Sequence, residues 1–417
     1  MNIMTLSEEL TWRGLLKDKT FENPAWLDTP QTFYLGSDCS SDSLAIGNLA
    51  IYMVARHLQR AGWKTVLLVG GATSLIGDPG GKNEERQLKS VEEVTRNVEG
   101  VRAQVEKLFE GREFTLVNNH DWFKGIGFLE FLRDVGKHYS MTELVQRDFI
   151  ADRMGEGAAG ISYAEFSYTL IQGYDFWHLY KEHGVVLQIG GSDQWGNMLS
   201  GVPLIRKKEG AEVHAFSMPL VINKATGVKF GKSEAGAVWL DPAKTTPTQF
   251  YQFWINVDDA DAEDYLKVYT MLPKEEIEHV LEAHQANPKE RFAQKRLAEE
   301  VTRLVHGGAE LVVAQKVTAA LIGDTSVSDL DEAGLVAMRA EIPYATASPG
   351  AHLSDVLVAA GLAVSKSEAR RLLQGNAISL NGDKTLREQL KESDFRNGRL
   401  LLRKGKAFKD SALVERG

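Results

Sequence analysis

The first half of the chain alternates short apolar runs with longer amphipathic stretches. The apolar runs lie at residues 32–35, 65–69, 114–117 and 185–189, and we expect them to form buried strands. Helical patterns occupy residues 43–62, 91–109 and 163–183. Strands that alternate with helices in this way indicate βαβ units, so the sequence predicts an α/β domain with a parallel sheet.

Each predicted strand is followed by glycine or polar residues, at 36–38, 70–73, 118–119 and 190–193. In open parallel sheets, ligands bind beyond the carboxyl ends of the strands. We therefore expect the functional site at that edge of the sheet.

The pattern changes after residue 246. Helical patterns cover 247–256, 261–270, 274–284, 288–305 and 308–322, with few strand signals between them. Residues 324–349 contain Pro343 and end in Ser348-Pro349, which favours a linker. Helices are then expected at 353–360 and 365–373, and strands at 377–380 and 400–402 around a turn at Asn381-Gly382. The predicted domains are 1–246, 247–323 and 350–417, with 324–349 as the linker.

Composition narrows the class of protein. The 417 residues predict two to three domains, and 43% hydrophobic content suits globular domains with their own cores. Cys39 is the single cysteine, which excludes an intrachain disulfide and suits a reducing compartment. We find no signal-like start and no apolar run of about 18 residues, so we expect a cytoplasmic protein with no membrane partner.

The net charge is unevenly distributed. The whole chain carries −9, which taken alone argues against a nucleic-acid partner. Residues 350–417, however, hold 13 lysines and arginines against 8 aspartates and glutamates, a net charge of +5 that leaves −14 for the rest. Two interpretations stay open at this point: a nucleic-acid-binding module, or ordinary solvated helix faces.

Two segments have a composition that suits phosphate groups. Residues 38–48 precede a predicted helix and include good N-cap residues at 40–43, so the helix N-terminus is a candidate anion site; a plainly capped helix is the alternative. Lys229-Phe230-Gly231-Lys232-Ser233, called the lysine loop below, carries two cations and a hydroxyl; a solvated basic loop is the alternative. The spacings of a P-loop and of the Gly-x-Gly-x-x-Gly dinucleotide fingerprint are absent.

A third set of polar residues falls on the expected ligand side of the sheet. Within it, Tyr168, Gln172 and Asp175 have the i, i+4, i+7 spacing of one helix face in an otherwise apolar helix. The full set is Tyr34, Asp78, Tyr168, Gln172, Asp175 and Gln194. It predicts a site for a small polar ligand, with an exposed polar stripe as the alternative.

These motifs, in this order, resemble bacterial tyrosyl-tRNA synthetases. The resemblance rests on 34–48, 69–79, 166–176, 190–197 and 229–233, extends through 237–242 and 250–254, and covers essentially the whole chain. It implies a class I synthetase with a Rossmann-like catalytic domain, an α-helical anticodon-side domain and a small α+β, S-four-like RNA-binding domain. Such an enzyme activates tyrosine with ATP and Mg²⁺ to tyrosyl-adenylate and then transfers the tyrosyl group to tRNA(Tyr).

The resemblance also assigns roles to residues of this chain. The catalytic residues would be Lys229, Lys232, Ser233, Ser40 and Asn48. Tyrosine would be bound by Tyr34, Asp78, Tyr168, Gln172 and Asp175, with Thr73 and Asn118 nearby. ATP would be bound by Gly36, Asp38, Gly47, Asp193, Gln194 and Lys232. The tRNA phosphates would be bound by Arg370, Arg371, Lys384, Arg399, Arg403, Lys404 and Lys406. No resident metal or prosthetic group is implied.

The resemblance further implies a homodimer, with the apolar residues 128–132 near the interface. Core packing is the alternative for that stretch.

One departure from the family concerns the nucleotide signature. The His-Ile-Gly-His motif of the family reads Ala45-Ile46-Gly47-Asn48, so the first position has lost its hydrogen-bonding side chain. We expect Ser40, Asn48 and the lysine loop to carry the phosphate contacts. The departure raises one rival function, a non-catalytic or weakened RNA-binding relative, and the lysine loop and the complete tyrosine set count against it. A second rival is a synthetase of altered amino-acid specificity, and the presence of both Tyr34 and Asp175 argues for tyrosine.

Overall fold

The chain folds into two units, described one at a time below. The structure is a computed structural model that describes residues 4–78, 87–154, 160–233, 236–405 and 410–417. The first unit comprises Met1–Asp241 and Asp258–Ala293, and the second comprises Pro242–Val257 and Gln294–Gly417. Among the described residues, no helix has both the length and the apolar character needed to cross a membrane.

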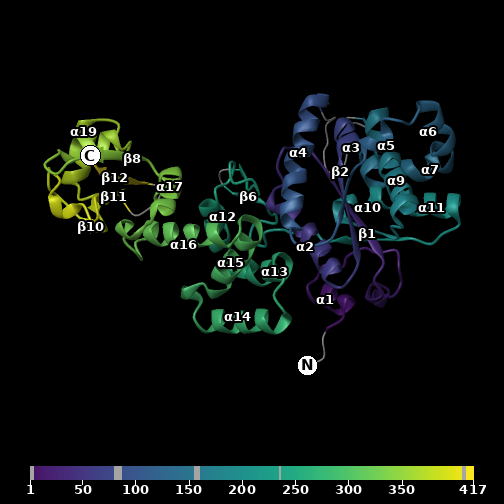
Figure 1. The fold of residues 1–417 in the computed structure, drawn as a ribbon, viewed down its shortest axis with the longest axis horizontal. Coiled ribbons are helices and arrows are strands. Elements are labelled where there is room, and N and C mark those ends of the chain that lie inside the picture. Colours follow the sequence, from purple (N-terminus) through teal and green to yellow (C-terminus); the bar gives the residue numbers. More distant parts are fainter. Residues whose placement is uncertain (1–3, 79–86, 155–159, 234–235, 406–409) are drawn as a thin grey trace. The chain divides into compact units, whose positions relative to one another are not determined.

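A parallel five-stranded sheet forms the centre of the first unit (Figure 1). Its strands are β1 (Thr32–Asp38), β2 (Lys64–Gly70), β3 (Thr115–Asn118), β4 (Leu187–Gly191) and β5 (His214–Met218), in the order β3-β2-β1-β4-β5. In the register of the sheet, Tyr34 of β1 lies between Val66 of β2 and Gln188 of β4. The predicted α/β class and the first four strands are confirmed. The sequence did not predict β5, because His214 and Ser217 interrupt its apolar pattern although all five of its residues are buried.

Helices cover both faces of this sheet. Helices α2 (Ile46–Arg60) and α4 (Val91–Leu108) lie on one side, and α9 (Tyr163–His183) and α11 (Gly201–Glu209) lie on the other (Figure 1). On the α9 side, Tyr34 and Leu68 pack against Phe176 and Ile205 in one apolar cluster. Every one of these strands therefore presents side chains to two helical layers, as a buried parallel sheet requires.

Shorter elements complete the first unit. They are α1 (Leu6–Trp12), α3 (Gly71–Ile76), α5 (His120–Phe123), α6 (Phe128–Asp134), α7 (Met141–Val145), α8 (Asp148–Met154), α10 (Trp195–Met198), α13 (Asp259–Tyr269), α14 (Lys274–Ala286) and the two-residue strands β6 (Lys232–Ser233) and β7 (Gly236–Ala237). The sequence predicts one helical domain over 247–323. The contacts instead group α13 and α14 with the first unit, and the helices on either side of them with the second.

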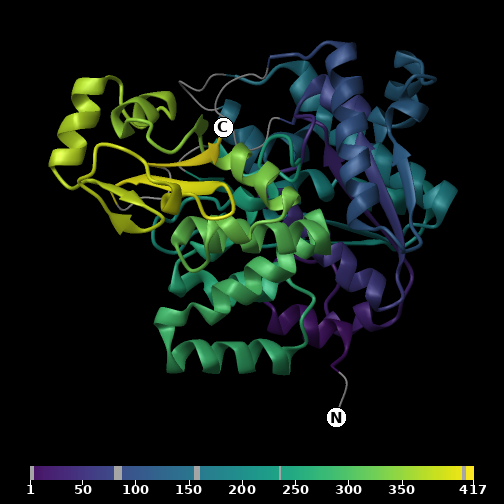
Figure 2. The same ribbon diagram turned by 60° about the vertical axis from the view of Figure 1, so that its left-hand side comes forward.

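The second unit begins with helices and ends in a small mixed sheet. The helices are α12 (Pro247–Ile255), α15 (Phe292–His306), α16 (Gly308–Ile322), α17 (Glu332–Glu341), α18 (Leu353–Ala359) and α19 (Lys366–Gln374). The strands are β8 (Tyr344–Ala347), β9 (Ile378–Leu380), β10 (Asp383–Lys384), β11 (Arg399–Lys404) and β12 (Ser411–Arg416), in the order β10-β9-β11-β12-β8. The yellow strands and the yellow-green helices α18 and α19 can be followed in Figure 2.

The turn at Asn381-Gly382 forms as predicted but joins different strands. Both residues have positive φ, 50° and 92°, as a tight hairpin turn of the primed type requires. The strand directly after the turn is β10, which the sequence did not indicate, and β11 pairs with the other edge of β9.

The segment 324–349 is folded, in contrast to the expected linker. It contains α17 and β8, and β8 pairs with β12 in parallel. Met338 packs in one buried cluster with Leu321 of α16 and with Leu413 of the sheet, and the Arg339 guanidinium contacts the Glu415 carboxylate at 2.8 and 2.9 Å. The proline and glycine signals in this segment therefore mark the ends of short elements rather than an unstructured connection.

Candidate active site

A cavity of about 510 Å³ opens at the carboxyl ends of β1 and β4. This is where the strand order of the sheet reverses, the usual ligand position in such folds. The predicted residues that line it are Tyr34, Gly36, Asp38, Ser40, Gly47, Asn48, Thr73, Asp78, Tyr168, Gln172, Asp175, Asp193, Gln194 and Lys229. The fold thus gathers, from positions 34 to 229, most of the residues that the sequence singled out.

Helix α9 presents three polar side chains to the cavity, as its spacing predicts. The helix starts at a capping box made by Ser162 and Glu165, which fixes the phase of its faces. Tyr168, Gln172 and Asp175 all line the cavity. Burial and the nearby Asp38 raise the pKa of the Tyr168 hydroxyl, which stays protonated and donates a 2.8 Å hydrogen bond to Asp38 Oδ2.

The carboxylate of Asp175 is fully buried and is held by two donors. Asn119 Nδ2 donates to Oδ2 at 3.1 Å, and Trp122 Nε1 donates to Oδ1 at 2.9 Å. Burial raises the pKa of Asp175 to about 8, against the lowering effect of these two hydrogen bonds. The sequence did not single out Asn119 or Trp122. The polar pair after β3 was the available signal, but the pattern alone did not show which asparagine bonds Asp175.

Asn118 is not among the residues that line the cavity. Its Oδ1 accepts the backbone N–H of Gly71 at 3.2 Å and of His120 at 3.0 Å, so it ties β3 to the start of α3. Asn119 instead bonds Thr73 Oγ1 at 3.2 Å as well as Asp175. Asn118 therefore joins β3 to α3, and its neighbour Asn119 holds Asp175.

Buried polar atoms without protein partners lie in the wall of the cavity. Within the described part of the chain, Tyr34 Oη, Gln172 Oε1 and Gln188 Oε1 have no hydrogen-bond partner. Burial, followed by the nearby Asp175, raises the pKa of Tyr34, so its hydroxyl stays a donor. An unsatisfied buried polar atom costs about 1–3 kcal/mol, which a bound polar ligand would recover. Gln188 was missed, although a lone polar residue inside the apolar run 185–189 was a signal.

Asp78 is positioned from β4's side of the cavity. Gln194 Nε2 donates to its Oδ2 at 2.5 Å, and Asn197 Nδ2 donates to its Oδ1 at 3.2 Å. Both carboxylate oxygens are therefore fixed in direction. Together with Asp38, Asp78 makes this part of the cavity a favourable place for a ligand's positive charge.

The N-terminus of α2 lies at the opposite side of the cavity. The helix starts at Ile46, with Ala45 as the N-cap, so the predicted caps at 40–43 do not cap it. The Ala45 side chain makes no cap, and Asn48 Oδ1 accepts the Ala45 N–H at 3.0 Å instead. Ser40 is exposed beside it. The chain thus keeps a helix N-terminus at the cavity, with Ser40 and Asn48 as its nearby polar side chains.

The lysine loop lies directly against this helix end. Gly231 has a φ of 125°, and a Cβ there would lie 3.3 Å from the backbone nitrogen of Gly47. Both glycines therefore permit a close approach of two backbones. Lys229 Nζ pairs with Asp193 Oδ2 at 2.9 Å across the mouth of the cavity. The backbone of Lys232 and Ser233 forms β6, and their side chains lie outside the described part of the structure.

The basic residues predicted to contact RNA fall into two groups. Arg370, Arg371 and Lys384 are exposed. Arg399 donates to the carbonyl of Leu330, Arg403 to that of Leu321, and Lys404 to that of Leu362, so these three hold the sheet to its own unit. Lys406 lies outside the described residues.

Comparisons with known proteins assign the family. The model of the class I tRNA synthetases (W and Y) matches residues 28–323, which include the whole cavity. The chain belongs to this family. A second model, that of the SYY-like C-terminal domain of tyrosine–tRNA ligases, matches residues 335–409.

Curated relatives and solved structures agree with this assignment. The tyrosine–tRNA ligase of Streptomyces griseus is 46% identical, over 98% of this chain and 98% of the relative. That of Latilactobacillus sakei is 44% identical, over 96% of each. The C-terminally truncated mitochondrial tyrosyl-tRNA synthetase of Aspergillus nidulans superposes with a TM-score of 0.69 at 30% identity, covering 76% of this chain and 94% of that one. The chain is thus a full-length match to bacterial members of the family.

The raised pKa of Asp175 predicts a pH-dependent stability difference. Its contribution to stability is complete below the ordinary pKa of about 3.8 and is lost as the pH rises toward about 8, because ionisation of the buried carboxyl is disfavoured. The free energy of unfolding of the wild type, measured relative to that of Asp175→Asn, should therefore fall between about pH 5 and about pH 8. Urea unfolding at both values measures the difference. The surface variant Asp121→Asn serves as the control, and a D175N difference that is equal at both values would contradict the assignment.

Proposed function

We propose that this chain is a tyrosine–tRNA ligase, which activates L-tyrosine with ATP and transfers the tyrosyl group to tRNA(Tyr). The observation that carries the proposal is the pair formed by Tyr34 and Asp175 in a class I synthetase cavity. Tyr34 offers a buried hydroxyl with no partner among the described residues, and Asp175 offers a buried carboxyl. A tyrosine phenol would satisfy both, whereas a phenylalanine ring would leave them desolvated and unpaired.

The rest of the amino acid would extend along α9. Asp78, Tyr168 and Gln172 would hold the α-ammonium group, since Asp78 is fixed by Gln194 and Asn197. The tyrosine carboxylate is itself the nucleophile and needs no general base. The cavity's task is to hold that carboxylate in line with the α-phosphate of ATP.

ATP would bind as its magnesium complex between the α2 N-terminus and the lysine loop. Magnesium in such sites is held largely by substrate phosphates. The phosphates would be bound by Ser40, Asn48, Lys229, Lys232 and Ser233. These residues would also stabilise the charge that develops on the leaving pyrophosphate. The nucleotide site would be lined by Gly36, Asp38, Gly47, Asp193 and Gln194. Lys229 would exchange its ion pair with Asp193 for a phosphate, a change that costs little at an exposed pair.

The exposed Arg370, Arg371 and Lys384 would contact the tRNA backbone. The protein would act in the cytoplasm, as expected from its sequence. A homodimer is favoured by α6, where Phe128 is 66% exposed and Leu129 is 78% exposed, contrary to core packing. Sedimentation velocity on the intact chain measures that state, and a monomer would contradict it.

The central test is tyrosine-dependent ATP–pyrophosphate exchange. We expect exchange with tyrosine and none with phenylalanine; absence of exchange with tyrosine would favour the non-catalytic RNA-binding alternative. Tyr34→Phe should lower the preference for tyrosine over phenylalanine by about tenfold, the value of one hydrogen bond of about 1.4 kcal/mol. Tyr251→Phe removes a hydroxyl in the second unit and should leave the preference unchanged. An unchanged preference in Y34F would point to altered amino-acid specificity.

We expect substitution of Ala45 by histidine to raise the rate of pyrophosphate exchange. Ala45 lines the cavity at the N-cap of α2 without a hydrogen-bonding side chain. Ala45→His should raise the exchange rate by about tenfold, the effect of one added hydrogen bond of about 1.4 kcal/mol in the transition state. KM for tyrosine should stay constant. An unchanged rate would mean that position 45 contributes nothing in this chain.

The exposed arginines of α19 predict a salt-dependent tRNA contact. Arg370→Ala with Arg371→Ala should raise KM for tRNA and reduce the salt slope of tRNA binding by about 1.4 to 1.8, since two phosphate contacts are lost. Pyrophosphate exchange without tRNA should be unaffected. Arg102→Ala with Lys124→Ala removes the same charge from the first unit. Equal effects of the two double variants would show that tRNA binding depends on the overall charge of the protein rather than on contacts with Arg370 and Arg371.

A further inference from the structure

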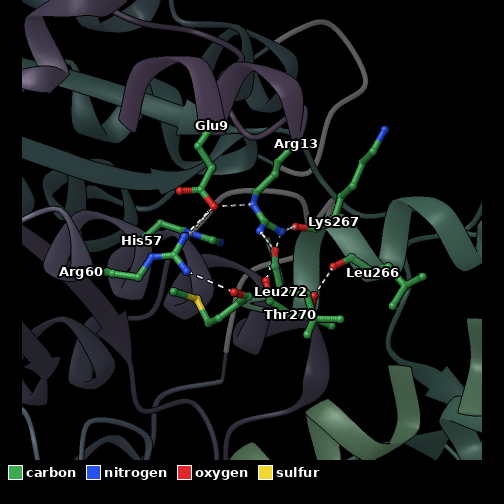
Figure 3. A network of polar contacts seen from close by, with 9 residues as sticks. Glu9, Arg13, His57, Arg60, Leu266, Lys267, Thr270 and Leu272 are labelled. Atoms are coloured by element: carbon green, nitrogen blue, oxygen red, sulfur yellow. Dashed lines mark hydrogen bonds and ion pairs between the residues drawn. The ribbon is translucent and has the colours of Figure 1, made fainter. Parts of the chain in front are cut away.

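A buried polar network joins α1, α2 and the end of α13 within the first unit (Figure 3). Its central residue is Arg13, which follows α1 and is 3% exposed. Arg13 Nη1 donates to the carbonyls of Lys267 at 2.7 Å and of Thr270 at 3.1 Å, and Nη2 donates to the carbonyl of Leu272. One side chain from the start of the chain thus binds three carbonyls around the C-terminal end of α13.

The other side of the network keeps this guanidinium in place. Glu9 Oε1 accepts from Arg13 Nε at 3.0 Å and from Arg60 at 2.5 Å, and it lies 3.3 Å from His57 Nδ1. Burial lowers the pKa of His57 to about 4, so His57 is neutral near pH 7 and Glu9 is the countercharge of the network. A buried guanidinium is tolerated only when it is paired and hydrogen-bonded in this way. Carbonyls at a helix C-terminus are favourable partners for a cation.

Helix α13 is also the surface on which the lysine loop rests. The ring of Phe230, inside the loop, lies 4.2 Å from the Tyr265 ring and 5.8 Å from the Tyr269 ring, measured between centroids. Residues 221–230 form a hairpin that leads into the loop. This hairpin is attached to the same helix, because the Lys224 N–H donates to Asp261 at 3.0 Å and Lys224 Nζ pairs with Asp264 at 2.8 Å.

The hairpin itself is held by its own backbone. The N–H of Asn223 donates to the carbonyl of Val228 at 2.9 Å, and that of Phe230 donates to the carbonyl of Val221 at 2.8 Å. A shift of α13 would therefore move the hairpin and Lys229 together.

We propose that Arg13 is a positioning residue for adenylate formation: it fixes the C-terminal end of α13, and α13 fixes the lysine loop at the mouth of the cavity. The inference rests on the proposed function, because the lysine loop matters only if the chain binds the phosphates of ATP. Tyr269 lies between Lys267 and Thr270, whose carbonyls Arg13 binds, so release of those carbonyls would loosen the packing of Phe230 against Tyr269. Displacement of a catalytic group by about 1 Å can cost about a hundredfold in rate.

The test is Arg13→Lys in the full-length chain. Lysine keeps the charge but is a point donor without the planar fork that reaches several carbonyls. We expect kcat for pyrophosphate exchange, counted per active site by the burst of pyrophosphate, to fall about tenfold, or about 1.4 kcal/mol. KM for tyrosine should not change, because the tyrosine site lies on β1 and α9. Ser7→Ala is the matched control: Ser7 is a buried α1 residue whose hydroxyl bonds Asp28, away from α13, and its kcat should stay at the wild-type value.

A double-mutant cycle with Phe230→Leu tests whether Arg13 acts through the packing of Phe230 on α13. If it does, R13K should cause little further loss of kcat in the F230L background. Three outcomes overturn the proposal: a wild-type kcat in R13K, a rise of KM for tyrosine that equals the fall of kcat, or losses that add in the double variant.

If R13K fails to fold, a second variant, Glu9→Gln, tests the same proposal. Glu9→Gln keeps the three carbonyl partners of Arg13 and removes the charge that faces Arg13 Nε and Arg60, so it should give a smaller fall of kcat in the same direction. An unchanged kcat in E9Q then overturns the proposal. Loss of tyrosine-dependent exchange in the wild type would instead overturn the proposed function, which separates the two failures.

Discussion

The arrangement of the cavity depends on the need to give its acidic side chains hydrogen-bond partners. Asp38, Asp78 and Asp175 all line the space beyond β1 and β4, and a carboxylate away from water is costly unless donors hold it. Each has donors from a different element: Tyr168 for Asp38, a glutamine and an asparagine for Asp78, and an asparagine and a tryptophan for Asp175. Hydrogen bonds thus fix the direction of these three acidic side chains before a ligand arrives, and the charge of Asp38 and Asp78 favours a ligand that brings an ammonium group.

The sequence predicted the parts of this site that follow from periodicity. The bounds of α9 were predicted without error, because a capping box at Ser162 starts the helix and Gly184, with a φ of 64°, ends it. The phase of the helix then fixed Tyr168, Gln172 and Asp175 on one face. Where no period exists, the sequence offers no choice: Asn118 and Asn119 stand next to each other at the end of β3, and only the tertiary contacts show that Asn119 reaches Asp175.

Composition was a weaker guide than contacts in the second unit as well. The excess of cations in residues 350–417 overlaps the segment 335–409, whose family model is that of a tyrosine–tRNA ligase C-terminal domain. It could not separate cations that face solvent from cations with structural bonds. Arg399 and Arg403 bind carbonyls of residues 330 and 321, so they are committed to the fold, whereas Arg370 and Arg371 are exposed on α19. Partners, rather than charge, decide which arginines are available to RNA.

The path of the chain explains why the boundary after residue 246 was hard to place. The chain leaves the first unit at Asp241, forms α12 in the second unit, and returns for residues 258–293 before it leaves again. This return has a physical purpose: a loop as polar and glycine-containing as the lysine loop has little core of its own. It needs an apolar surface, and α13 supplies one through Tyr265 and Tyr269. A helix that serves as such a surface must itself be held in place, and Arg13 of the N-terminal segment binds the carbonyls of Lys267 and Thr270 at its C-terminal end. Segments far apart in sequence are thus joined in one mechanical unit around the nucleotide side of the cavity.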